Sequence, residues 1–150
     1  MAWFSPQPLT VPEVIALNAA SLGAKDAVVV DDVATSWRDF GAGTARIANA
    51  MLDAGMAPGD RVVILMNNSY EMAEAMFGVT RAGLCAVPLN CSITDEAVAG
   101  MIADSAAKAV IASDEHIARI ERLRARLTAT TRERLIGLGA APEGWRAYPA

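Results

Sequence analysis

From residue 24 onward, the sequence alternates short runs rich in β-branched residues with segments of helical periodicity. This alternation is typical of βαβ units, in which helices connect parallel strands and cover the faces of the sheet. We therefore expect an α/β fold with a largely parallel sheet of βαβ units flanked by helices. The runs expected to form its strands are residues 61–66, 84–89, 109–112 and 134–138.

Capping residues and glycines delimit the expected helices. Thr10, followed by Pro12 and Glu13, has the pattern of a capping box and predicts a short N-terminal helix that stops at Gly23. The later helices are expected over residues 37–52, from a cap at Asn68 to about 81, over 95–104, and over 114–127 after a cap at Ser113.

Two short runs, residues 27–30 and 33–36, are separated by Asp31-Asp32, a dipeptide that favours a tight turn. They predict a β-hairpin between the N-terminal helix and the parallel sheet.

The periodic pattern stops after Gly139, and no later element is expected to bury Trp145 or Tyr148. Residues 139–150 are therefore interpreted as a tail. Residues 1–150 are interpreted as a single domain that ends in mid-architecture, and its cut edge is expected to drive homo-oligomer formation.

Composition excludes several classes of protein. A chain of 150 residues with 53% hydrophobic and 20% charged residues can bury a substantial core and fits one domain. Its longest uncharged stretch, residues 82–94, has 13 residues, whereas a membrane-spanning helix needs ~20. We expect no membrane span, and the absence of a secretory pattern in the first dozen residues makes the cytoplasm the expected location.

Net charge and cysteine content exclude a nucleic-acid partner and a disulfide framework. The net charge of −4 and the pI of about 4.9 disfavour a nucleic-acid partner, because phosphate contacts need a basic surface. Cys85 and Cys91 are the only cysteines and are expected to be reduced thiols that pack as small core residues.

The basic residues concentrate in one segment. Residues 119–134 carry six arginines against two glutamates, and Arg119, Arg122 and Arg126 are spaced to share one helical face. An amphipathic helix whose cations complement the helix dipole explains this pattern. The alternative is an anion site, for example for the phosphate of a nucleotide or coenzyme.

No motif in the chain supplies catalytic chemistry. Gly41-Ala42-Gly43 lies within a helical pattern and is interpreted as close helix packing, and neither lysine follows a glycine as a P-loop requires. His116 is the sole histidine and is interpreted as a partly exposed polar residue. Met66, Met72 and Met76 are interpreted as core residues. We therefore expect no catalytic, cofactor-binding or metal-binding residue in this chain.

Three passages in order carry a resemblance to a known family. They are residues 34–40 (Ala-Thr-Ser-Trp-Arg-Asp-Phe), residues 57–69 with Pro58-Gly59-Asp60, and residues 81–90 with Gly83 and Val87-Pro88-Leu89-Asn90. Together with the N-terminal helix, residues 27–113 resemble the N-terminal portion of the adenylate-forming superfamily, which comprises acyl-CoA synthetases, luciferases and nonribosomal peptide adenylation domains.

The resemblance implies a full-length enzyme that uses ATP and magnesium to convert a carboxylic acid to an acyl-adenylate and then transfers the acyl group to coenzyme A. In that family, the phosphates are held by a Ser/Thr/Gly-rich loop bearing a lysine, and a second lysine lies on a mobile C-terminal domain. This chain contains neither. The expectation is therefore an N-terminal fragment of an acid–thiol ligase that is inactive by itself and binds no cofactor alone.

Two other interpretations remain open. The chain could be a stand-alone α/β module that binds a nucleotide or a protein, because open parallel sheets bind ligands at their carboxyl ends whatever their ancestry. It could also be a non-catalytic subunit that pairs with a separate catalytic chain.

Overall fold

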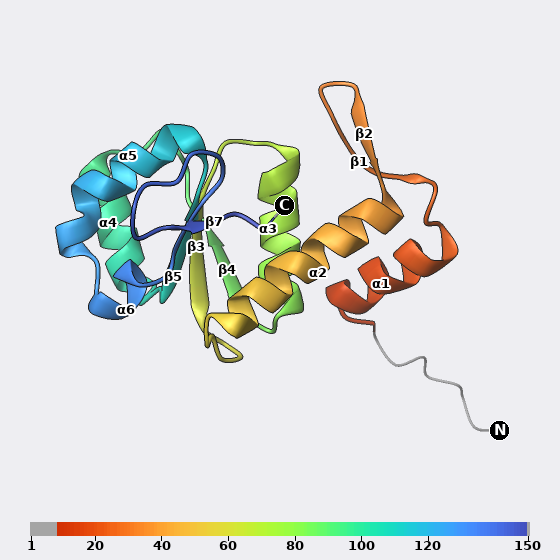
Figure 1. Ribbon diagram of the computed structural model, residues 1–150, viewed down its shortest axis with the longest axis horizontal. Coiled ribbons are helices and arrows are strands. Elements are labelled where there is room, and N and C mark those ends of the chain that lie inside the picture. The colour runs from red at the N-terminus through yellow and green to blue at the C-terminus, as the bar shows by residue number, and fades with distance from the viewer. Residues whose placement is uncertain (1–8, 150) are drawn as a thin grey trace.

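The core of the protein is a parallel five-stranded sheet with the order β4-β3-β5-β6-β7. A computed structural model describes residues 9–149 and confirms the expected α/β class (Figure 1). The strands of this sheet are β3 (Arg61–Leu65), β4 (Cys85–Pro88), β5 (Ala109–Ala112), β6 (Leu135–Gly137) and β7 (Arg146–Ala147).

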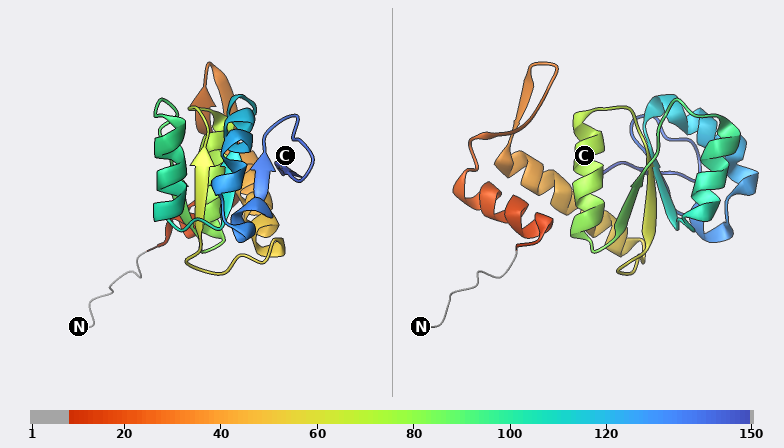
Figure 2. Two further views of the ribbon diagram at one scale, coloured as in Figure 1. Left: turned by 90° about the vertical axis from the view of Figure 1, so that its left-hand side faces the viewer. Right: turned by 180° about the vertical axis from the view of Figure 1, so that it is seen from behind.

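Helices cover both faces of the sheet, α2 and α3 on one side and α4 and α5 on the other (Figure 2). No helix within residues 9–149 is both long enough and apolar enough to cross a membrane. The helical segments are α1 (Val11–Ser21), α2 (Trp37–Asp53), α3 (Tyr70–Arg81), α4 (Asp95–Asp104), α5 (Asp114–Leu123), the 3-10 turn η1 (Arg124–Arg126) and α6 (Ala129–Arg132).

Strand β3 is buried on both faces, which explains why its sequence is continuously apolar. Val62 and Ile64 pack into the cluster beneath α2 and α3, whereas Val63 and Leu65 pack into the cluster beneath α4 and α5. All four side chains are completely buried. A strand covered on both faces has no polar face, so a run without alternation is what a buried parallel sheet requires.

The predicted hairpin is present as β1 (Asp26–Val30) and β2 (Val33–Ser36), which pair antiparallel. Asp31 and Asp32 form its turn with φ values of 47° and 64°. Two consecutive left-handed residues are typical of a type I′ turn, a conformation that aspartate tolerates better than most residues. The hairpin stands away from the parallel sheet, beside the start of α2 (Figure 1).

The turn that precedes β3 joins three strands at the amino edge of the sheet. The Asp60 carboxylate accepts a hydrogen bond from the Ala57 backbone N–H at 2.9 Å and pairs with the Lys108 ammonium at 2.6 Å. Its backbone carbonyl accepts from the Cys85 N–H at 2.8 Å. The Pro-Gly-Asp passage therefore links the starts of β3, β4 and β5.

The close packing predicted for Gly41-Ala42-Gly43 is confirmed within α2. A Cβ at Gly41 would lie 2.8 Å from the Ala19 Cβ of α1, and a Cβ at Gly43 would overlap the Glu74 carboxylate of α3. Glu74 is 3% exposed, so the missing side chain at Gly43 makes the space that this buried carboxylate occupies.

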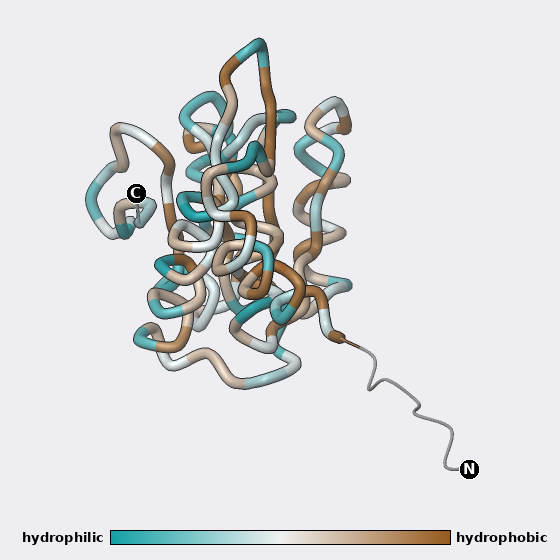
Figure 3. The backbone as a smooth tube through the Cα atoms, turned by 90° about the vertical axis from the view of Figure 1, so that its right-hand side faces the viewer, coloured by the Kyte–Doolittle hydropathy of each residue, from teal (hydrophilic) through white to brown (hydrophobic). Residues whose placement is uncertain are grey.

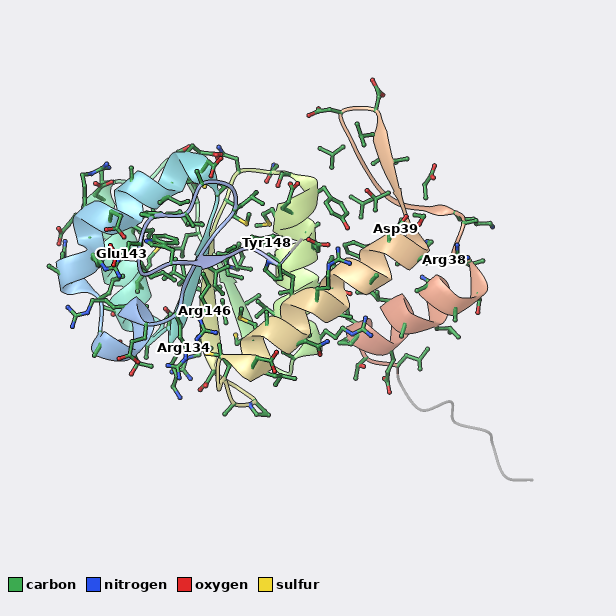
Figure 4. The ribbon with its side chains drawn as sticks, viewed as in Figure 1. Arg38, Asp39, Arg134, Glu143, Arg146 and Tyr148 are labelled. Atoms are coloured by element: carbon green, nitrogen blue, oxygen red, sulfur yellow. The ribbon has the colours of Figure 1, made fainter. Side chains whose placement is uncertain are left out.

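Residues 139–150 were expected to be a tail without further elements, and this prediction is wrong for the last described residues. Residues 146–147 form β7, and Tyr148 is buried with its hydroxyl 2.9 Å from Glu74 Oε2, to which it donates, and 3.1 Å from the Glu71 carbonyl oxygen. Figure 4 labels Tyr148 beside α3. A two-residue strand has no periodicity to detect, and the partners of Tyr148 lie more than 70 residues earlier in the sequence.

Three smaller expectations also need correction. The helix predicted to reach residue 127 ends at Leu123 and is followed by η1 and α6. Ser69, not Asn68, caps α3, because its hydroxyl accepts from the Met72 N–H. Cys85 is exposed rather than in the core, because it lies on β4, an edge strand that pairs only with β3. Cys91 is partly buried.

We predict that Asp60→Asn lowers the free energy of unfolding by about 1 kcal/mol at neutral pH, because it removes the charge that pairs with Lys108. The hydrogen bonds from Lys108 and from the Ala57 backbone lower the pKa of Asp60. The contribution is therefore complete above the unfolded pKa and is lost as the pH falls through the folded pKa. Urea unfolding as a function of pH measures both effects.

Asp53→Asn is the matched control, because Asp53 is an exposed aspartate at the end of α2. Equal loss of stability in both variants would contradict the role assigned to Asp60.

A second prediction uses two helical glycines. Gly43→Ala should destabilise the fold by about 2 kcal/mol, because its methyl group would displace the Glu74 carboxylate. Gly100→Ala in α4 should instead stabilise it by about 0.5–1 kcal/mol, because no atom lies within 4 Å of a Cβ there. Thermal unfolding of both variants tests this, and a stable Gly43→Ala protein would refute the packing explanation.

Candidate functional site

The carboxyl edge of the sheet between β3 and β5 is the candidate functional site. These neighbouring strands send the chain in opposite directions, β3 to α3 on one face and β5 to α5 on the other. Such a switch point is where open parallel sheets form a ligand crevice.

A direct contact joins the two loops at this point. Asn67, in the loop after β3, donates its side-chain amide to Glu115 Oε1 in the first turn of α5 at 2.7 Å. A hydrogen bond from its own backbone N–H, and the one from Asn67, lower the pKa of Glu115. The carboxylate is thus charged at neutral pH and ties the two strand ends together.

Two polar atoms beside this contact are buried without a hydrogen-bond partner among the described residues. They are the Ser113 hydroxyl oxygen and His116 Nε2. Ser113 is 7% exposed, and although it occupies the predicted cap position of α5, its side chain makes no capping hydrogen bond. His116 is half-buried, as interpreted from the sequence, and burial lowers its pKa. The imidazole is therefore neutral at neutral pH.

The helices that begin at this edge already carry their own negative charges. An acidic residue in the first turn offsets the positive end of the helix dipole, which otherwise attracts anions. These residues are Glu71 in α3, Asp95 and Glu96 in α4, and Asp114 and Glu115 in α5.

Neither lysine of the chain lies at this edge. Lys25 precedes the hairpin, and Lys108 lies at the amino edge, paired with Asp60. No lysine offsets the carboxylates of this edge, and Arg119 and Arg122, which reach it from α5, are both paired with Asp95. The residues that the structure describes therefore offer no free cation to a triphosphate there.

Arg119 holds the loop that follows β4. It is 8% exposed, and its guanidinium pairs with Asp95 Oδ1 at 2.7 Å. It also donates to the carbonyl of Cys91 at 2.8 Å and to the carbonyl of Ile93. This arginine is fully engaged within the fold.

The other two arginines of the predicted face are paired as well. Arg122 lies 2.9 Å from Asp95 Oδ2, and Arg126 contacts both oxygens of Glu96 at 2.5 and 2.9 Å. The sequence placed these arginines on one face correctly, and that face meets the acidic first turn of α4. The contacts support the structural interpretation of the basic segment and leave the anion-site alternative without a free guanidinium in this group.

Sequence reasoning singled out no residue of this edge as functional. Asn67 lies two residues after β3, and Ser113 directly follows β5. A polar residue just after a buried strand was the signal that the sequence offered for this site. The methionines do follow expectation, because Met66 is buried and Met72 and Met76 pack against the core. Within residues 9–149, no group of three or more His, Cys, Asp or Glu residues is arranged to hold a metal ion.

Comparison with known proteins identifies similar sequences over most of the chain. The profile of the family described as "AMP-binding enzyme" matches residues 15–148. A fatty acid–[acyl-carrier-protein] ligase from Streptomyces coeruleorubidus is 28% identical over 142 residues, or 95% of this chain. A 3-hydroxybenzoate–CoA/4-hydroxybenzoate–CoA ligase from Thauera aromatica is 36% identical over 90 residues, or 60% of this chain.

A crystal structure from Rhodopseudomonas palustris CGA009, of a protein assigned as a long-chain-fatty-acid CoA ligase, has the same fold. It superposes with a TM-score of 0.86 at 26% identity and covers 96% of this chain. The chain spans only 36% of that protein, 27% of the Streptomyces relative and 17% of the Thauera relative.

We predict that His116 titrates below 6.5, because burial disfavours the charged imidazole. As the sole histidine, it gives one Hε1 signal that proton NMR can follow against pH. Between the folded and unfolded pKa values, only the unfolded chain binds the proton. The free energy of unfolding should therefore fall as the pH is lowered through this window, and His116→Gln should remove that fall.

The chain unfolded in urea is the reference, because its histidine has the ordinary pKa. A folded pKa at or above that of the unfolded chain would contradict the burial of this side chain.

Proposed function

Because the chain belongs to the AMP-binding enzyme family, we propose that it forms the N-terminal portion of an ATP-dependent acid–thiol ligase. Such an enzyme joins a carboxylic acid to AMP and then transfers the acyl group to a thiol, here that of coenzyme A. The named activities of the relatives support this class, since one joins a fatty acid to a carrier protein and another joins hydroxybenzoate to CoA.

The passages that carry the family resemblance have scaffold roles in this chain. Asp60 links three strands at the amino edge. Gly83, with φ of 76°, lets the chain turn from α3 directly into β4, and Pro88 closes the edge strand. We therefore assign residues 1–150 to one supporting domain of the ligase.

The absence of a free cation from the described part of the carboxyl edge carries the proposal that this domain alone is inactive. Transfer of an adenylyl group requires positive groups arranged around the phosphates. Here the first turn of α5 carries Asp114 and Glu115, neither lysine is near them, and the guanidinium groups of Arg119 and Arg122 are already paired with Asp95. ATP, magnesium, coenzyme A and the carboxylic acid would therefore be held by polypeptide outside this domain.

A stand-alone binding module is the second candidate. The contact of Asn67 with Glu115 at the switch point favours it, because the carboxyl ends of neighbouring strands are where open parallel sheets bind ligands. The neighbouring carboxylates favour an uncharged or cationic ligand over a nucleotide.

We predict no ATP–pyrophosphate exchange by the 150-residue chain with short-chain, fatty or aromatic acids, and no shift of the His116 NMR signal on titration with Mg–ATP. Circular dichroism would verify that the protein assayed is folded. Exchange above the protein-free background with any acid would refute the proposed inactivity, and a saturable ATP-dependent shift would contradict the absence of a triphosphate site at this edge.

The proposal also predicts what the gene that encodes this chain contains. We expect the reading frame to continue past Ala150 into a Ser/Thr/Gly-rich loop with a lysine, and the longer protein to catalyse the exchange. A stop codon directly after Ala150 would refute the ligase proposal.

A further inference from the structure

The segment that follows β6 is held on the sheet by very few side chains. Residues 139–149, called the strap, contain no Val, Ile, Leu, Met or Phe. Figure 3 shows the strap as the mostly pale and teal loop at the end marked C. Between residues 139 and 149, Tyr148 is the only buried residue, and both residues of β7 are exposed. The strap therefore has little apolar surface that could hold it in place.

Tyr148 fastens the strap on the face of the sheet that α2 and α3 cover. It belongs to the core cluster of that face, and its hydroxyl donates to Glu74 Oε2 at 2.9 Å. Glu74 is 3% exposed, and its other oxygen, Oε1, accepts from the Tyr70 hydroxyl at 3.1 Å. Because this carboxylate is buried, water has little access to Oε2 while the strap is in place.

Trp145 fastens the strap on the opposite face. Its ring packs against the cluster beneath α4 and α5, and its indole N–H donates to Glu121 Oε1 at 2.6 Å. The same oxygen accepts from Arg124 at 2.6 Å. The hydrogen bond from Trp145 is the main cause that lowers the pKa of Glu121, so the acceptor is charged at neutral pH. Trp145 and Tyr148 thus flank β7 and contact the sheet from its two faces.

Gly139 separates the strap from the rest of the sheet. The residue before it, Leu138, is still part of the sheet, because its N–H donates to the Ala112 carbonyl at 2.9 Å. Gly139 itself has φ of 91°, and a Cβ there would overlap the Asp114 carboxylate in the first turn of α5. Glycine is the residue that can change its backbone angles most freely. Gly139 is therefore the natural hinge of the strap.

We propose that the strap opens and closes on the sheet as one unit, hinged at Gly139 and held closed by Trp145 on one face and Tyr148 on the other. A segment with few buried contacts opens at a lower free energy than the whole domain unfolds. All three residues of β6 are buried, and an open strap leaves this strand as an unpaired edge that can accept another strand. The strap is thus a gate for the edge of β6. This motion is independent of the ligase activity proposed above.

Hydrogen exchange followed by NMR tests whether the strap moves as one unit. Two protons report on its two faces: the Tyr148 amide N–H, which donates to the Gly137 carbonyl at 2.9 Å, and the Trp145 indole N–H. The Val110 amide N–H, which donates to the Arg134 carbonyl at 3.1 Å, reports on the sheet itself. In the wild-type chain, the two strap protons should have the same protection factor, and it should be about tenfold or more below that of Val110.

Tyr148→Phe removes the donor to Glu74 Oε2, and this loss matters only while the strap is closed, because water reaches the oxygen when the strap is open. The variant should therefore favour the open state and accelerate exchange of the Trp145 indole N–H about tenfold, with Val110 unchanged. Tyr70→Phe is the matched control. It removes the other hydroxyl from the same carboxylate, but Tyr70 and Glu74 both lie on α3 in either state of the strap, so exchange at Trp145 should not change.

Trp145→Phe provides the reverse measurement. Loss of the indole hydrogen bond to Glu121 should accelerate exchange of the Tyr148 amide on the opposite face, by less than tenfold because the Glu121 side chain is 35% exposed and water can replace the indole. The proposal is overturned if the strap protons and Val110 are equally protected in the wild type. It is also overturned if either strap variant changes exchange on its own face alone, or if Tyr70→Phe acts as strongly as Tyr148→Phe.

Discussion

The sheet depends on how β3 begins. The Asp60 carboxylate is held by Ala57 and Lys108, and its carbonyl accepts the first backbone hydrogen bond of β4. The next residue, Arg61, accepts the Lys108 N–H that starts β5 and donates its guanidinium to the Ser105 carbonyl at the end of α4. Two consecutive residues therefore position three strands and one helix. This geometry gives a physical reason for the Pro-Gly-Asp-Arg passage, and the reason is structural rather than chemical.

The sequence predicts those parts of the fold whose signals are local. The buried run of β3 and the Asp31-Asp32 turn can each be recognised within a few residues, and both are present. The strand β7 could not be recognised, because its place is decided by the sheet and by the distant contact of Tyr148 with Glu74. Strand order is equally hidden, which is why Cys85 was wrongly expected to be in the core.

The candidate site was less predictable than the fold. Asn67 lies in the loop after β3 and Glu115 in the first turn of α5, and they become neighbours only because β3 and β5 are adjacent. The acidic first turns are readable from sequence, but that they converge follows from the parallel direction of the strands. The cations at both edges are already paired, Lys108 with Asp60 at the amino edge and Arg119 and Arg122 with Asp95 near the carboxyl edge. Phosphate chemistry in a longer enzyme therefore needs cations from elsewhere.

Helices α2 and α3 form the base on which α1 and the hairpin pack. α1 packs on α2 and α3, and the hairpin contacts the same two helices. Those helices are locked together by the fit of Glu74 into the space left by Gly43, and Tyr148 extends this lock to the last strand. Burial raises the pKa of Tyr148, so its hydroxyl keeps the proton that it donates to Glu74.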